Sequence, residues 1–410
     1  MRTLSQKQPP LNPPPGRATF DNTRRLTALQ GSLRENNLAG AVLAFSRDVY
    51  YYTGLALPAW LMVRPDDWRL FLRRGLETLP GDCPVENGRI TAGLDLAGAC
   101  AQFFPGLGAG EKVGLELDML SMLEGRRYQK ALGARELVNV SPLVMDMRLV
   151  KDLGEVASLE RACAALAAGH QAALMALHEG VTELEWAAAI ENAQRLAGHQ
   201  GVFFFRQPDV LMGRGPVASG PHLTRTTGTV FTATGAGLHP SLPAGPSART
   251  LEPGDLVLAD IPACLEGYHA DMSRMHALGE PPAGAAELCD ALRQISDGWL
   301  AGLRPGMTCQ EACQIAHDLA AGLGLADAFQ RLPSGAIIPY VGHGVGLELN
   351  EPPLITPRNP ARLAAGMTLA LELHLLHPGG FLLKLEDTLH LTERGGRLLT
   401  REGRGLNLVG

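Results

Sequence analysis

The sequence lacks long hydrophobic runs and any excess of positive charge. No run of about 18 apolar residues occurs, so no membrane-spanning helix is expected. The first residues contain no apolar core of the kind found in secretory signal peptides. With 42 acidic and 36 basic residues, the formal net charge is -6, which argues against nucleic-acid and anionic-membrane partners. We therefore expect a soluble, cytoplasmic protein without nucleic-acid or membrane partners.

Cysteine is scarce and follows no disulfide pattern. The chain has 7 cysteines, an odd number whose spacing resembles no disulfide framework, which fits a reducing cytoplasm. Cys309 and Cys313 lie one turn apart on a predicted helix, where they could form one edge of a metal site. Because no second pair is nearby, the pattern favours two buried core residues instead.

The length and the order of predicted elements indicate two domains. A chain of 410 residues can bury two separate cores. Residues 1–19 are rich in proline and glutamine and predict a flexible segment. Strands alternate with helices over residues 20–147, which predicts a small α/β domain. Residues 148–410 predict a larger domain of helices and strand-rich blocks.

In the first half, the pattern predicts no catalytic group of residues. A helix is expected from Asp21 to Asn36. Tyr50, Tyr51 and Tyr52 could line a ligand site, but aromatic residues in short strands are more often core residues. The expected strands are Gly40–Phe45, Tyr50–Thr53, Leu61–Val63, Leu70–Leu72 and Gly114–Glu116, the last followed by a helix through Tyr128 and Lys130.

In the second half, glycines and capping residues mark the ends of the helices. Gly180 is expected to stop a long helix, and Thr182 with Glu185 forms the pattern of a capping box for the next one. The expected helices are Glu155–Glu179, a helix opened by Thr182, Ala285–Gly302 and Thr308–Gly322, and a strand-rich block is expected over Tyr340–Leu398.

The stretch Gly254–Arg274 predicts a β-hairpin that carries two acids. Its first strand contains Leu256 to Leu258, its turn residues run from Pro262 to Gly267, and Tyr268 to Met272 form the return strand. Asp260 and Asp271 lie near the strand ends among apolar neighbours. A charged carboxylate is costly to bury without a positive partner. A metal ion, or an ion pair with Arg274, would satisfy this requirement, and the stretch alone leaves both open.

Three downstream residues extend this group. His343 lies in GHGVGLELNEPP, Glu372 in TLALELHL and Glu386 in FLLKLEDTLHL. Singly, each of the two glutamates is also explained as a solvent-facing strand-edge residue or a salt-bridged core acid. Together with the hairpin they supply four carboxylates and one imidazole, which suit two divalent ions such as Mn, Co, Zn or Fe. Two such ions about 3.5–4 Å apart would activate a bridging water and polarise a carbonyl.

These motifs, in this order and spacing, resemble the pita-bread metallohydrolase family, which includes methionine aminopeptidase, aminopeptidase P, prolidase and creatinase. The resemblance covers roughly residues 150–400, and the first half is similar to the smaller domain of the prolidase and aminopeptidase P branch. It implies an α+β protein in which a C-terminal pita-bread domain follows a smaller α/β creatinase-type domain. The matching stretches are GDLVLADIPACLEGYHADMSR, GHGVGLELNEPP, LALELHL and LLKLEDTLHLTERGG.

The resemblance also assigns roles to the candidate site residues. It implies that Asp260 binds one metal ion and that His343 and Glu372 bind the second. Asp271 and Glu386 would bridge the two ions, and Glu372 would also act as the general base and acid. The implied protein is a dinuclear Xaa-Pro peptidase, most simply with manganese, that cleaves short peptides before proline and forms a homodimer.

The sequence departs from the family pattern at three positions. Ala244 and Asn350 replace histidines that in the family contact the substrate and stabilise the tetrahedral intermediate. Asn350 can donate a hydrogen bond but cannot carry a proton. Lys384 replaces an arginine, which keeps the charge but not the planar fork. His239 and His374 are candidates for the missing substrate contacts, and His269 is a weaker one.

The lost histidines keep two other functions open. One is a creatinase-like hydrolase or lyase acting on a small amide or amidine. The other is a binding or scaffold protein that keeps the fold without turnover, as a catalytically impaired family member would.

Overall fold

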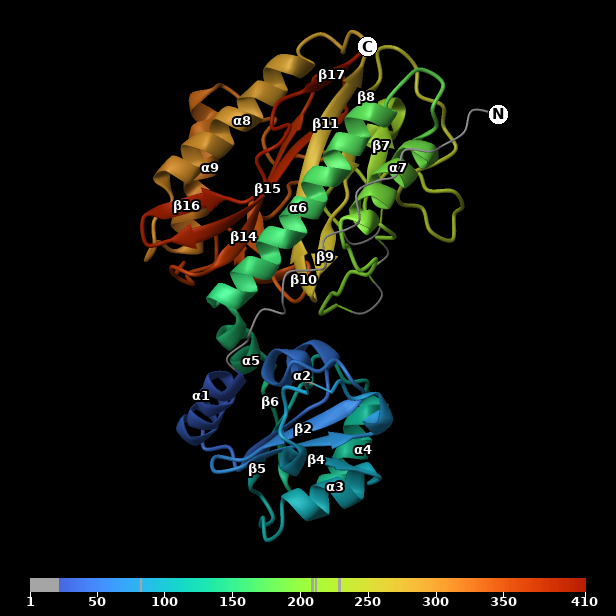
Figure 1. The fold of residues 1–410 in the computed structure, drawn as a ribbon. Coiled ribbons are helices and arrows are strands. Elements are labelled where there is room, and N and C mark those ends of the chain that lie inside the picture. The colour runs from blue at the N-terminus through green and yellow to red at the C-terminus, as the bar shows by residue number, and fades with distance from the viewer. Residues whose placement is uncertain (1–21, 82, 208–209, 211, 228–229) are drawn as a thin grey trace, which may run out of the picture.

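The computed structural model describes residues 22–81, 83–207, 210, 212–227 and 230–410. The predicted flexible segment 1–19 and the predicted helix start at Asp21 lie outside these residues. The described chain forms a smaller body around one sheet, followed by a larger body around a second sheet (Figure 1).

The smaller body is a six-stranded sheet with the order β4-β3-β2-β1-β5-β6. β1 pairs parallel with β5 and antiparallel with β2, so the sheet is mixed. Its strands are β1 Gly40–Leu43, β2 Ala59–Val63, β3 Trp68–Leu72, β4 Ile90–Ala92, β5 Lys112–Leu115 and β6 Glu136–Asn139. Its helices are α1 Asn22–Glu35, α2 Ser46–Thr53, α3 Leu96–Phe103 and α4 Met122–Leu132.

The predicted strand Tyr50–Thr53 is wrong, because these residues form the second half of helix α2. Gly54 ends the helix in the left-handed conformation that glycine tolerates best. Tyr51 and Tyr52 are buried core residues, whereas the hydroxyl of Tyr50 donates to the carbonyl of Glu266 in the larger body (3.0 Å). A run of aromatic residues fits a helix face as well as a strand, and packing decides between them.

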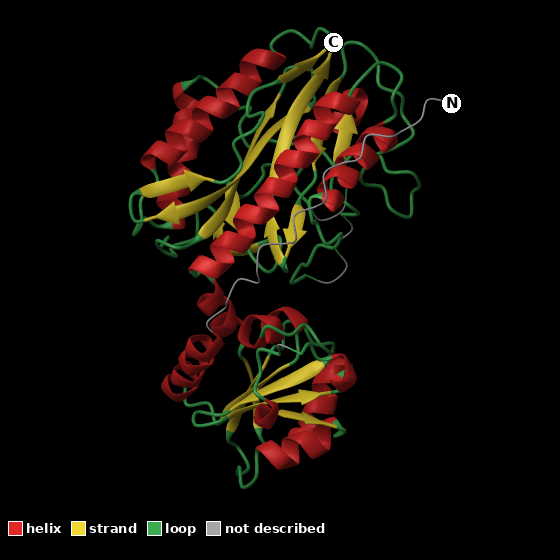
Figure 2. Ribbon diagram, in the orientation of Figure 1, coloured by secondary structure: helices red, strands yellow, loops and turns green. Residues whose placement is uncertain are grey.

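The larger body is built on a nine-stranded sheet whose main path is β13-β12-β14-β15-β11-β8-β7. Two strands lie off this path: β16 pairs with β15, and β17 pairs with β11. Helices cover these strands (Figure 2): α8 contacts β14 and β15 and α9 contacts β13 of the large sheet, whereas α6 lies against the separate two-stranded sheet of β9 and β10. The helices of this half are α5 Ser141–Arg148, α6 Leu153–Ala176, α7 Glu183–Leu196, α8 Ala285–Gly302 and α9 Cys309–Gly322. The strands are β7 Val217–Ser219, β8 Leu256–Asp260, β9 Ala263–Leu265, β10 Tyr268–Ala270, β11 Met272–Leu278, β12 Gly342–Gly344, β13 Glu351–Ile355, β14 Thr368–Leu376, β15 Leu382–Thr392, β16 Gly395–Leu398 and β17 Asn407–Val409.

Most predicted helices of this half are confirmed. The Thr182 capping box opens α7, and Thr308 caps α9 in the same way. Cys309 and Cys313 are fully buried in the core between the helices and the sheet, as the core interpretation expected. None of the helices in the described part of the chain is long and apolar enough to cross a membrane.

Both strand segments expected in the stretch Gly254–Arg274 form, but their predicted pairing with each other is wrong. β8 pairs with β11, so Asp260 lies opposite Ser273, whereas the predicted return strand is largely β10. The segment between Asp260 and Asp271 contains a second hairpin, in which β9 pairs with β10. Its two turn residues, Glu266 and Gly267, both have positive φ, which is the geometry of a type I′ turn.

Candidate active site

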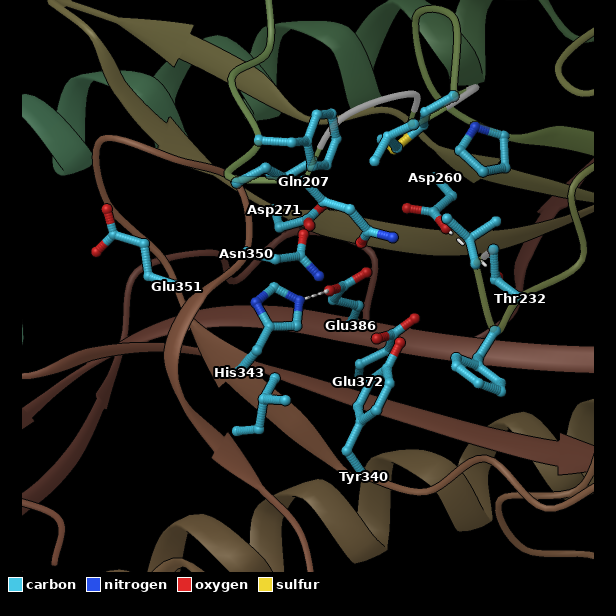
Figure 3. Close-up of a pocket in the computed structure, with 18 of the residues that line it drawn as sticks. Gln207, Thr232, Asp260, Asp271, Tyr340, His343, Asn350, Glu351, Glu372 and Glu386 are labelled. Atoms are coloured by element: carbon cyan, nitrogen blue, oxygen red, sulfur yellow. Dashed lines mark hydrogen bonds and ion pairs between the residues drawn. The ribbon is translucent and has the colours of Figure 1, made fainter. Parts of the chain in front are cut away.

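Neighbouring strands of the larger sheet bring the predicted site residues to one pocket. The register sets Glu372 of β14 opposite Glu386 of β15, and Ser273 of β11 opposite both Glu386 and Asp260. All the predicted metal ligands are at most 5% exposed, and Figure 3 shows them facing the same space. These ligands are Asp260, Asp271, His343, Glu372 and Glu386.

The pocket has a volume of about 390 Å³, which is in the usual range for a small-ligand site. Its floor is acidic, and its walls carry aromatic and polar side chains that the sequence analysis did not single out. Among these wall residues are Phe205, Gln207, Phe231, Thr232 and Tyr340.

Glycines position His343 on its strand. Gly342 and Gly344 flank it on β12, which runs between β13 and β14. A Cβ atom on Gly342 would lie 2.3 Å from the carbonyl oxygen of Ala370, and one on Gly344 would lie 2.1 Å from that of Pro352. The absence of side chains at these two positions therefore lets the neighbouring backbone approach β12 closely.

Asp271, His343 and Glu386 form a group suited to one metal ion. Each offers a ligand atom, and these atoms lie within 4.8 Å of one another. His343 Nδ1 donates to the carbonyl oxygen of Gly344 (3.0 Å), which leaves Nε2 with a free lone pair facing Glu386 Oε1 at 3.8 Å. Such a hydrogen bond fixes the tautomer of a metal-binding histidine.

The buried acids of the pocket floor also favour the binding of a cation. Burial raises the pKa of Asp271 well above its usual value, and repulsion from Glu386 and Asp260 raises it further. Burial likewise raises the pKa of Asp260 and of Glu386, although Lys384 counteracts part of this effect. A divalent ion would neutralise this buried negative charge. The donor set around His343 therefore fits a divalent metal ion.

Lys384 is the positive partner of Asp260, one of the two acids of the predicted hairpin. Its Nζ lies 2.6 Å from Asp260 Oδ2, 2.8 Å from Glu372 Oε1 and 2.9 Å from Glu386 Oε2. Burial alone would lower the pKa of Lys384, but the carboxylates outweigh burial and hold it well above its usual value. The lysine is therefore charged.

Arg274, the partner considered from the sequence, pairs elsewhere. Its guanidinium donates to Asp387 Oδ1 (2.7 Å) and to the carbonyl oxygen of Glu386 (2.6 Å). Ser273, one residue earlier, faces the site and donates to Glu386 Oε2 (2.8 Å). Because successive side chains of a strand point to opposite faces, Arg274 cannot reach the acids that Ser273 faces.

Of the residues predicted to contact substrate, only Asn350 lines the pocket. His239 is exposed outside the pocket, where its Nδ1 lies 2.9 Å from Ser241 Oγ. His374 is fully buried opposite Lys384, and its Nε2 lies 3.6 Å from Glu372 Oε1. Burial and the charge of Lys384 lower the pKa of His374, so this imidazole is neutral.

His269 and Ala244, two further positions considered in the sequence analysis, are both buried. His269 is fully buried, accepts a hydrogen bond from the backbone N–H of Phe204 (3.0 Å) and donates to the carbonyl oxygen of Gly346 (2.9 Å). Burial lowers its pKa to about 4. Ala244 is buried at 8% exposure and does not line the pocket.

Tyr340 is a site residue that the sequence analysis missed. It lines the pocket beside Glu372 (Figure 3). Burial raises the pKa of Tyr340 well above its usual value, and the negative charge of Glu372 raises it further. The phenol is therefore a hydrogen-bond donor. The feature of the sequence that could have identified Tyr340 as a site residue is its position shortly before the GHG motif.

An ionic network anchors the pocket loop that carries Asn350. Arg148 of α5 pairs with Asp48 of the smaller body (2.7 Å), with Glu348 (3.2 Å) and with Glu351. Glu348 and Glu351 flank Asn350 in the chain. The smaller body thus helps to hold one wall of the site.

Comparisons with known proteins agree with this architecture. The model of "Metallopeptidase family M24" matches residues 157–393, and that of "Creatinase/Prolidase N-terminal domain" matches residues 25–150. These matches confirm the expected pita-bread domain and the creatinase-type domain before it.

Individual relatives match the chain to different extents. A probable dipeptidase PepE from Mycobacterium bovis is 31% identical over 250 residues, which is 61% of this chain and 58% of that protein. The Xaa-Pro dipeptidase of Pyrococcus furiosus is 25% identical over 93% of this chain and 99% of its own length. The structure of a Xaa-Pro dipeptidase from Bacillus anthracis superposes with a TM-score of 0.79 at 23% identity, covering 95% of this chain and 100% of that one.

Proposed function

The chain belongs to metallopeptidase family M24, and on this premise we propose that it hydrolyses short peptides whose second residue is proline. The observation that carries the proposal is the convergence of Asp271, His343 and Glu386 on the acidic floor of a pocket of about 390 Å³. Relatives of nearly full-length overlap bear the name Xaa-Pro dipeptidase, which supports the substrate class.

The residues around the floor take the following roles in the proposed reaction. When bound, a divalent ion supplies a Lewis acid and lowers the pKa of a water molecule. Glu372 takes the proton of the attacking water and returns it to the leaving amine. The Tyr340 phenol, which lies beside Glu372, donates to this carboxylate and holds it in place during the reaction. Asn350 donates a hydrogen bond to the oxyanion where the family has a histidine.

The remaining parts of the proposal follow from the resemblance. We take Mn²⁺ as the ion, a homodimer as the assembly, and residues 20–147 and 148–410 as the two domains. A reducing, cytoplasmic location is part of the proposal because all the cysteines are free thiols.

The test is release of free proline from Xaa-Pro dipeptides by Mn²⁺-loaded protein. The matched substrates carry alanine in place of proline, and His343→Ala serves as the inactive control. We expect turnover of the proline peptides that depends on metal and is lost in His343→Ala. Absence of turnover across the panel, with metal bound in the same sample, would contradict the proposal.

A second candidate is hydrolysis of a small non-peptide amide or amidine. It is favoured by Asn350, which lines the pocket where a proton-carrying histidine is expected for peptide cleavage. The same metal-loaded sample distinguishes the two, since turnover of cyclic and linear amidines without turnover of dipeptides would select this second function.

A further inference from the structure

The ammonium group of Lys384 occupies the point at which three carboxylates of the site converge. Its Nζ is within 2.6–2.9 Å of one oxygen each from Asp260, Glu372 and Glu386. An ammonium group has three N–H donors, and this arrangement gives each of them one carboxylate. Lys384 is 3% exposed, so its charge is compensated by these groups and not by bulk water.

Glu386 divides its two oxygens between Lys384 and the histidine side of the pocket. Oε2 contacts Lys384 and also accepts from Ser273, whereas Oε1 faces His343 Nε2 at 3.8 Å. A carboxylate that bridges two cations presents one oxygen to each of them. At Glu386 Oε2, the ammonium group of Lys384 takes the place of one of these cations.

We propose that Lys384 takes the place of one of the two expected cations, so that the site binds a single divalent ion on Asp271, His343 and Glu386. The inference rests on the proposed function, because it requires that the chain binds a metal ion. It departs from the dinuclear site that the resemblance implies, because Asp260 and Glu372 serve Lys384 rather than a second ion.

Lysine and the arginine that it replaces in the family pattern distribute their positive charge differently. A guanidinium group spreads its charge over a planar fork, whereas the ammonium of lysine is a compact point charge. Asp260 Oδ2 and Glu372 Oε1 both point at this charge, and an ion bound to the same oxygens would lie directly beside it. Two positive charges at that separation repel strongly in a buried site. The strand also keeps Lys384 in place, because it lies on the same face of β15 as Glu386.

Metal content per chain tests this inference. Protein stripped with chelator, reloaded with excess Mn²⁺ and desalted is measured by elemental analysis and native mass spectrometry. We expect one ion per chain in the wild type, one in Lys130→Met, which removes an exposed lysine, and two in Lys384→Met. Two ions in the wild type would overturn the inference, as would one ion in folded Lys384→Met.

Asp260→Asn provides a second variant if Lys384→Met fails to fold. With Lys384 in the cation position, Asp260→Asn still binds one ion, whereas a two-ion site falls from two to one. Proline release, measured on the same samples, separates the two proposals. One ion without turnover contradicts the proposed function alone, two ions with turnover contradict the inference alone, and no ion contradicts both.

Discussion

Glu372 on β14 lies directly opposite Glu386 on β15, and the ammonium group of Lys384 contacts both carboxylates. Two like charges at such a cross-strand position are destabilising unless a cation lies between them. The register therefore fixes a place for positive charge before any ligand is considered. Because both acids contact Lys384, a substitution of one acid also changes the surroundings of the other.

Glu386 is the residue on which metal binding depends most. Glu386→Gln removes a charged ligand and leaves Lys384 with fewer acceptors. Because even indirect partners of a metal ligand are worth 10- to 100-fold in affinity, we expect Mn²⁺ affinity to fall by at least about 100-fold. Competition with a fluorescent chelator measures this, with Glu280→Gln as an exposed control. Unchanged affinity would remove Glu386 from the metal site.

Ser273 positions Glu386 through a single hydrogen bond. Its hydroxyl is buried and donates to Glu386 Oε2 at 2.8 Å. In Ser273→Ala we expect unfolding free energy to fall by about 1 kcal/mol. We also expect Mn²⁺ affinity to fall about 10-fold, because the carboxylate loses its orientation. Urea unfolding and chelator competition measure the two effects, and exposed Ser241→Ala should show neither. A stability loss without any change in affinity would mean that Ser273 only fills space.

The network around Arg148 makes the stability of the fold depend on pH. Burial alone would raise the pKa of Glu351, but Arg148 and Lys151 outweigh it and lower the value to about 2. A lowered folded-state pKa means that Glu351 contributes its full stability above its unfolded pKa of about 4.3. This contribution is lost as the pH falls toward 2.

Glu351→Gln isolates this contribution. We expect the variant to be less stable than the wild type at pH 7, and the difference to shrink as the pH falls from about 4.3 toward 2. Denaturant unfolding of both proteins across this range measures it, and Glu280→Gln is again the exposed control. A difference that stays constant over the range would show that the charge of Glu351 is not responsible.

Asn350 tests whether the pocket still performs peptide chemistry. Asn350→His adds a group that can carry a proton at the pocket wall, and we expect kcat/KM for Xaa-Pro dipeptides to rise by about 10-fold or more. Asn350→Ala should lower it, because the amide donor is lost. Ala244→His is a poor choice for the same purpose, since Ala244 is buried away from the pocket. If both Asn350 variants match the wild type, this residue does not face the reacting group.

The sequence by itself determined the acids of the site and most of the helices. Carboxylates in apolar strands require positive charge, which singled out Asp260, Glu372 and Glu386 as candidates, and their roles came from the family resemblance. The capping residues Thr182 and Thr308 likewise act within one helical turn and are visible in the sequence. His343 joined these acids because its motif, GHGVGLELNEPP, matches the family pattern.

Only the tertiary structure decided which cation the acids share. Arg274 is nearer in sequence to Asp260 and Asp271, yet Lys384 binds Asp260 because it lies on the side-chain face that the sheet turns toward the pocket. The conformation of Tyr50–Thr53 and the pairing of β9 with β10 were settled in the same way. Such features depend on strand register between distant segments, and register is set by packing of the whole sheet rather than by local sequence.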